Sequence, residues 1–123
     1  MKMFLIDVEN NKTEVVDCDG ELQSLYDLVK CDYVEIVERN ICGVECNIIC
    51  DEEGKLKNKR LSGVMYDKSD NFVGNLLICG MADSEGDLTG LKDEEIEIIQ
   101  DCIGEFDYEG ESEPRKILLG IEY

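Results

Sequence analysis

Five acidic residues occupy every second position near the C-terminal end of the chain: Glu105, Asp107, Glu109, Glu111 and Glu113. In an extended segment successive side chains point to opposite faces, so these five carboxylates would share one face, about 6.6–6.8 Å apart. We call them the acidic ladder. A regular row of negative charge can bind cationic groups, and it predicts a surface that engages a basic site on a partner. The alternative is a solvated connector whose spacing has no function.

The opposite charge gathers in one short basic cluster. Its members are Lys55, Lys57, Lys59 and Arg60. If the protein binds a small phosphate-bearing ligand, for example as a sponge for a nucleotide signal, this cluster would supply the positive field. A structural alternative is a charged loop or sheet edge that discourages unwanted strand pairing.

Three cysteines at a spacing of four, Cys42, Cys46 and Cys50, raise the possibility of a metal site. On a helix neighbouring members would lie about 6 Å apart and could converge on one ion. On a strand they would lie about 13 Å apart, whereas zinc holds its sulfur ligands about 2.3 Å away. The apolar residues between them favour a strand, so we expect small core side chains and no metal site.

The chain contains no histidine, which removes Ser-His and Cys-His nucleophile pairs and every histidine-containing metal site. Among thirty acidic residues no pair stands out as an acid and a base. The loop Asp83–Asp87 has oxygen ligands and a glycine, but it lacks the length and the closing glutamate of an EF-hand, so we expect an exposed turn there. The sequence therefore predicts a protein that is not an enzyme and carries no cofactor.

The net charge of −18 argues against direct binding to nucleic acid or to anionic membranes, because both would repel the protein. The negative charge is concentrated after residue 82, where the chain has fourteen acidic residues and three basic ones. No apolar run reaches membrane-spanning length, and Phe4-Leu5-Ile6 is too short for a signal peptide. We therefore expect a cytoplasmic protein whose seven cysteines are reduced.

The elements that would position these residues alternate between strands and helices. Strands are expected at 1–8, 13–17, 32–39, 43–50, 72–79 and 117–121, and helices after Asp19-Gly20 and over 93–103, with Gly104 as the stop. This order predicts an α+β fold: a mostly antiparallel sheet of about five to six strands with two helices packed on it. We expect one domain, with an α+β core over 1–103 and an acidic connector and terminal strand over 104–123 packed on it.

Several stretches resemble domain-of-unknown-function family 3846. They are DGELQSLYDLVKCDYVEIV (19–37), DEEGKL (51–56), FVGNLLICGM (72–81) and DLTGLKDEEIEII (87–99), and the resemblance covers about residues 2–103. The family consists of small acidic proteins of phages, plasmids and their bacterial hosts. The resemblance implies an α+β fold and a mobile-element setting, and it brings no catalytic residue.

Together these observations predict a non-enzymatic binding protein whose acidic face engages a basic protein surface. It could act as a nucleic-acid mimic that blocks a host defence or DNA-processing factor. The small-ligand binder described above is one alternative. Another is a structural accessory protein that forms a homodimer through a sheet edge such as Ile117–Ile121.

Overall fold

The computed structural model describes residues 1–10, 12–54, 61–65, 71–106 and 115–121. These residues form strands and helices in the following order: β1 (Lys2–Asp7), β2 (Lys12–Asp17), α1 (Leu22–Val29), β3 (Val34–Ile41), β4 (Val44–Asp51), β5 (Leu61–Met65), β6 (Asn71–Val73), β7 (Leu76–Cys79), α2 (Asp93–Asp101), β8 (Ile103–Phe106) and β9 (Arg115–Ile121). The α+β class predicted from the sequence is confirmed.

The central sheet has five strands in the order β2-β1-β7-β4-β3, and every neighbouring pair is antiparallel. The β1–β2 connection is held by Asp7, whose carboxylate accepts hydrogen bonds from the backbone N–H and the side-chain amide of Asn10, at 3.3 and 2.8 Å. Burial pushes the pKa of Asp7 upward, but these hydrogen bonds and the charges of Lys30 and Lys12 together outweigh it, and the pKa lies below its usual value. The charged form of Asp7 thus stabilises the turn.

The β3–β4 hairpin turns on two residues, Cys42 and Gly43, which both have positive φ angles, of 51° and 93°. Two positive φ angles in a two-residue loop define the type I′ turn, whose twist matches that of the flanking strands. The side chain of Asn40 accepts a hydrogen bond from the Gly43 N–H at 2.8 Å. Asparagine and glycine favour this geometry, so a cysteine at the first position goes against local preference.

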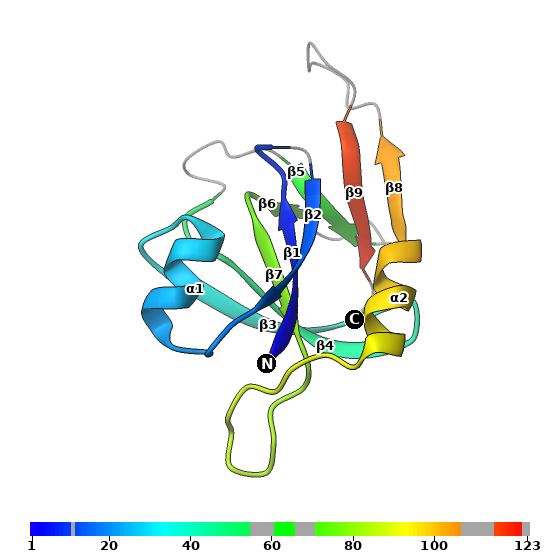
Figure 1. Ribbon diagram of the computed structural model, residues 1–123. Helices are drawn as coiled ribbons and strands as arrows, with labels where there is room; N and C mark the ends of the chain where they lie inside the picture. The colour runs from blue at the N-terminus through cyan, green and yellow to red at the C-terminus, as the bar shows by residue number, and fades with distance from the viewer. Residues whose placement is uncertain (11, 55–60, 66–70, 107–114, 122–123) are drawn as a thin grey trace.

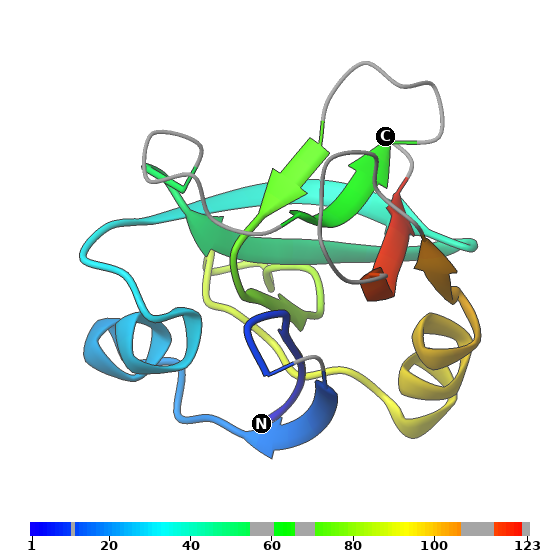
Figure 2. The ribbon, with the colours of Figure 1, turned by 90° about the horizontal axis from the view of Figure 1, so that it is seen from above.

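Two helices cover opposite faces of the central sheet, as Figures 1 and 2 show with α1 on one side of β1 and β7 and α2 on the other. Side chains alternate along each strand. Leu5 therefore packs in the core under α1, with Leu25 and Val29. Ile6 packs in the core under α2, with Ile96 and Ile99. Each helix is therefore held to the sheet by the apolar side chains of one face.

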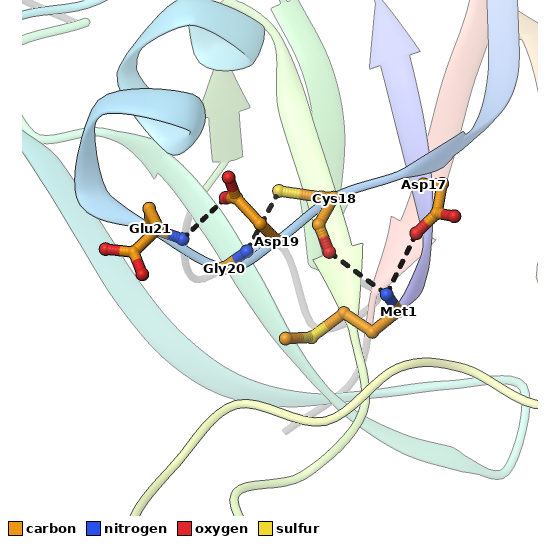
Figure 3. Close-up of polar contacts among 6 residues, drawn as sticks. All are labelled: Met1, Asp17, Cys18, Asp19, Gly20 and Glu21. Carbon is orange, nitrogen blue, oxygen red and sulfur yellow. Dashed lines mark hydrogen bonds and ion pairs between the residues drawn. The ribbon is translucent and has the colours of Figure 1, made fainter.

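The start of α1 is fixed by polar contacts at the end of β2 (Figure 3). The Met1 ammonium donates to the Asp17 carboxylate at 2.9 Å and to the Cys18 carbonyl at 3.1 Å. Asp19 then accepts a hydrogen bond from the backbone N–H of Glu21 at 2.8 Å, and this bond and one from the Ser24 side chain lower its pKa. The predicted helix opening at Asp19-Gly20 agrees with these contacts, and the first helical residue is Leu22.

A second sheet, in the order β6-β5-β9-β8, lies on the α2 side of the central sheet, where Phe72 of β6 joins the core. Its β5–β9 pair is parallel. The predicted single strand over 72–79 is wrong, because Gly74, with a φ of 77°, breaks it into β6 and β7, which belong to different sheets. The predicted helix end at Gly104 is also wrong: α2 stops at Asp101, and Gly104 lies within β8.

The final strand is confirmed as β9, but it is not an edge. It pairs with β5 on one side and with β8 on the other. Dimerisation through an open edge at Ile117–Ile121 therefore does not fit this sheet.

Candidate functional site on the acidic face of α2

The residues predicted to bind a partner fall largely outside the described part of the chain. Glu105 belongs to β8, which is extended as expected. The other members of the acidic ladder lie outside the described residues: Asp107, Glu109, Glu111 and Glu113. The same holds for the whole basic cluster, Lys55, Lys57, Lys59 and Arg60.

The structure shows a second acidic surface, on the helix that leads into β8. Glu94, Glu97, Ile98 and Asp101 are all exposed, at a spacing of i, i+3, i+4 and i+7, and we call them the α2 stripe. With 3.6 residues per turn this spacing places them on one face. Ile96 and Ile99 face the opposite way, into the core. Ile98 keeps 41% of its surface exposed, so the stripe combines three carboxylates with one apolar side chain.

The charges of the stripe are partly unfavourable for the helix itself. Acidic residues in the first turn of α2, such as Glu94, interact well with the positive end of the helix dipole. Asp101 lies at the negative end, and the last turn contains no basic residue. A carboxylate there costs about 0.3–1 kcal/mol. The like-charged pairs Glu94–Glu97 and Glu97–Asp101 add about 0.2–0.5 kcal/mol each. Helix stability alone therefore does not account for this arrangement.

The beginning of α2 is fastened to β1. The Lys2 ammonium pairs with the Asp93 carboxylate at 2.8 Å, and the Leu91 N–H donates to the Lys2 carbonyl at 2.8 Å. The hydrogen bond and charge of Asp93 raise the pKa of Lys2. The Glu95 side chain also reaches back to accept a hydrogen bond from the Lys92 N–H at 2.8 Å. These contacts set the direction in which the stripe points.

The end of α2 is fastened by a disulfide bond between Cys42 and Cys102, whose Cα atoms lie 6.6 Å apart, within the usual range. The prediction of seven reduced cysteines is therefore wrong for this pair. Cys42 was expected to be a small core side chain, but it lies in the β3–β4 turn and is exposed. Cys46 and Cys50 do lie buried on β4, as predicted. No metal-binding group of three or more suitable side chains occurs within the described ranges.

The loop Asp83–Asp87 is an exposed turn, as expected from the sequence, and hydrogen bonds within the loop hold it together. One Asp83 carboxylate oxygen accepts hydrogen bonds from the N–H groups of Glu85 and Asp87, at 2.9 and 3.0 Å. Its geometry is that of a turn. Within the part of the chain that the structure describes, no helix is long and apolar enough to cross a membrane.

A shallow groove of about 240 Å³, which the sequence did not reveal, lies beside the β3–β4 hairpin. Its walls come from the hairpin and from the segment after β7: Glu38, Arg39, Asn40, Glu45 and Met81. The groove is smaller than the 300–1,000 Å³ typical of small-molecule sites. It is also open, and its walls are about equally polar and apolar. The α2 stripe is therefore the stronger candidate.

Comparison with protein families gave one match: residues 1–104 fit the family described as Domain of unknown function (DUF3846). Comparisons with curated proteins and with solved structures gave no match. The matched region includes α2 and both cysteines of the disulfide, whereas all five residues of the acidic ladder lie beyond it. The stripe therefore belongs to the family domain, and the ladder follows it in the chain.

Proposed function

The chain belongs to the family described as Domain of unknown function (DUF3846), so its function must be argued from its own surfaces, and we propose that it binds a basic protein through the α2 stripe. In this proposal the protein is not an enzyme. Its partner is a nucleic-acid-binding protein in the cytoplasm of a bacterial host, and the setting is a phage or another mobile element.

The observation that carries the proposal is the position of three exposed carboxylates on a helix that is fastened at both ends. Lys2 holds the start of α2 and the disulfide to Cys42 holds its end. A fixed charged face loses little conformational freedom on binding, which favours affinity. The exposed Ile98 gives the same face an apolar contact, which is what the centre of a protein interface needs.

Electrostatics favours a basic partner. The net charge of −18 would speed encounter with a positive surface, and salt would weaken the association because the Debye length falls from about 10 Å at 0.1 M to about 3 Å at 1 M. From Glu94 to Asp101 the helix rises about 10 Å, so its carboxylates follow one another at about 5 Å along the axis. Phosphates on one DNA strand are spaced about 3.4 Å apart along the axis of the double helix. The similar scale supports mimicry of nucleic acid as the mode of binding.

The proposal is tested by affinity capture from a bacterial lysate with three forms of the protein. One is the wild type. The second is the stripe variant, with Glu94→Gln, Glu97→Gln and Asp101→Asn. The third is a charge-matched control with Glu14→Gln, Glu21→Gln and Asp32→Asn, three exposed acids on β2 and beside the two ends of α1. Both variants lose the same amount of negative charge.

We expect the wild type and the control to retain the same basic protein, and the stripe variant to lose it. High salt should elute this protein, and double-stranded DNA should compete for it. Equal retention by all three forms would show that the stripe is not the binding surface. Retention that DNA does not affect would contradict mimicry.

A further inference from the structure

The disulfide joins two places that secondary structure alone would leave independent. Cys42 is in the turn between β3 and β4, and Cys102 follows the last residue of α2 and precedes β8. Sixty positions separate the two cysteines in the chain. The bond therefore fixes the end of the α2 stripe and the start of the strand that bears Glu105.

The pair differs from the other cysteines in its accessibility. Cys42 is exposed and Cys102 is half-buried, so small reagents can reach them. Cys46, Cys50 and Cys79 are buried, and burial raises the pKa of their thiols to about 12, 12 and 11. Thiols of this kind form little reactive thiolate at neutral pH. Oxidation at these five positions should therefore centre on Cys42 and Cys102.

The backbone at Cys42 also indicates that its side chain has a use. Its φ of 51° lies in the left-handed region, which favours glycine and asparagine and which a cysteine adopts at a cost. Asparagine before Gly43 would suit the type I′ turn better. The sulfur is the chemical group that distinguishes cysteine from a better turn former, and in this structure the sulfur is bonded to Cys102.

We propose that Cys42 and Cys102 form a reversible redox latch that holds the end of the α2 stripe when oxidised and releases it when reduced. In compartments kept reducing, protein disulfides are usually transient and redox-sensing. The regulatory part of this proposal, control of partner binding, rests on the function proposed above. The formation of the latch does not.

The latch closes by thiol–disulfide exchange with a small-molecule disulfide such as oxidised glutathione. The Cys42 thiolate attacks one sulfur of the oxidant, forms a mixed disulfide and expels one small thiol. The Cys102 thiolate then attacks the Cys42 sulfur and expels the second small thiol. The protein loses two electrons and two protons, and the oxidant is reduced to two thiols. Excess small thiol reverses both steps.

Opening the latch leaves most of α2 in place. Ile96 and Ile99 remain in the core, and Asp93 remains paired with Lys2. The last turn, with Asp101, and the first residues of β8 lose their covalent link to the hairpin. Reduction should therefore loosen the end of the stripe without unfolding the domain.

The latch is tested by equilibrating the full chain with glutathione buffers of different reduced-to-oxidised ratio. The remaining thiols are then alkylated, and peptide mapping by mass spectrometry assigns them. As the buffers become more oxidising, we expect Cys42 and Cys102 to become protected from alkylation together, in one two-electron transition. Cys46, Cys50 and Cys79 should stay reduced. Separate protection of Cys42 and Cys102, a different pairing, or no transition between the fully reduced and fully oxidised buffers would overturn the proposal.

The release is tested by hydrogen exchange on the oxidised and reduced wild type, which have the same sequence. We expect amides of the last turn of α2 and of β8 to exchange at least tenfold faster after reduction, at labelling times so short that amides of β1 and β7, which open only on global unfolding, remain protected in both states. Equal exchange rates of the α2 and β8 amides in the oxidised and the reduced protein would contradict a local release. The Cys102→Ala variant should behave like the reduced wild type in both redox states.

Control of binding is tested with a short fluorescent oligolysine peptide at low salt. We expect the reduced protein to bind several-fold more weakly than the oxidised protein, and Cys102→Ala to bind equally in both states. Equal binding of the wild type in both states would refute regulation by the latch. If the stripe variant and the charge-matched control bound oligolysine equally, the function proposed for the stripe would fail instead, whatever the redox titration showed.

Discussion

Replacing Cys42 with asparagine separates the disulfide from the turn that contains it. Asparagine followed by Gly43 is a preferred pair for a type I′ turn, so Cys42→Asn keeps the hairpin while it removes the bond to Cys102. Any large loss of stability in this variant must then come from the missing cross-link.

The size of the loss follows from the separation of 60 positions between the two cysteines. Closing a loop of this length lowers the entropy of the unfolded chain by about 14 cal/mol/K, or about 4 kcal/mol at 25 °C. For a domain of this size about 1 kcal/mol corresponds to roughly 4 °C in Tm. We therefore expect Cys42→Asn to melt roughly 15 °C below the oxidised wild type.

Circular dichroism melts of both proteins, each with and without a reducing agent, give the comparison. Reduction should lower the Tm of the wild type to nearly that of Cys42→Asn, and it should leave the Tm of the variant unchanged. Oxidised proteins that melt within about 2 °C of each other, where roughly 15 °C is expected, would refute the cross-link argument. If reduction lowered the Tm of both proteins equally, the stabilising disulfide would have to involve other cysteines.

Two further predictions concern single carboxylates. Asp101→Lys should stabilise the domain by about 1–3 kcal/mol in urea denaturation, because it replaces an unfavourable anion at the end of α2 with a favourable cation and turns the repulsion from Glu97 into an attraction. The same change should weaken binding to the basic partner. Lower stability would contradict the dipole argument. Asp7→Asn should destabilise the protein most above about pH 4, where the unfolded-state carboxyl is ionised. Because the folded-state pKa of Asp7 is lowered, the advantage of the wild type should shrink as the pH falls through that pKa. An unchanged difference in unfolding free energy between neutral and strongly acid pH would refute the role given to the Asp7–Asn10 contacts.

The sequence was most informative where local patterns decide the structure. In α2 the apolar residues Ile96 and Ile99 lie three positions apart and mark the buried face, so the same spacing also places the α2 stripe on the outer face. Helix α1 and the β1–β2 hairpin could be predicted from the sequence because their signals, turn residues and apolar periodicity, lie within a few positions of one another.

Non-local features could not be predicted in this way. The strand over 72–79 looks continuous, and only its two different pairings show that Gly74 divides it. Strand β8 is short and follows a helix almost directly, so its pairing with β9 has no local signal. The Cys42–Cys102 bond joins residues far apart in the chain, and none of the seven cysteines reveals a partner through spacing alone.

The central claim is that the α2 stripe, and not the net charge alone, binds a basic partner. The most direct test is the dissociation constant between the captured partner and three oxidised forms of the protein: the wild type, the stripe variant and the charge-matched control. At about 0.1 M salt we expect the stripe variant to bind at least tenfold more weakly, a loss of about 1.4 kcal/mol, and the control to stay within about twofold of the wild type. At about 1 M salt the differences should nearly vanish. Equal weakening of the two variants would show that overall charge governs binding and would contradict the claim.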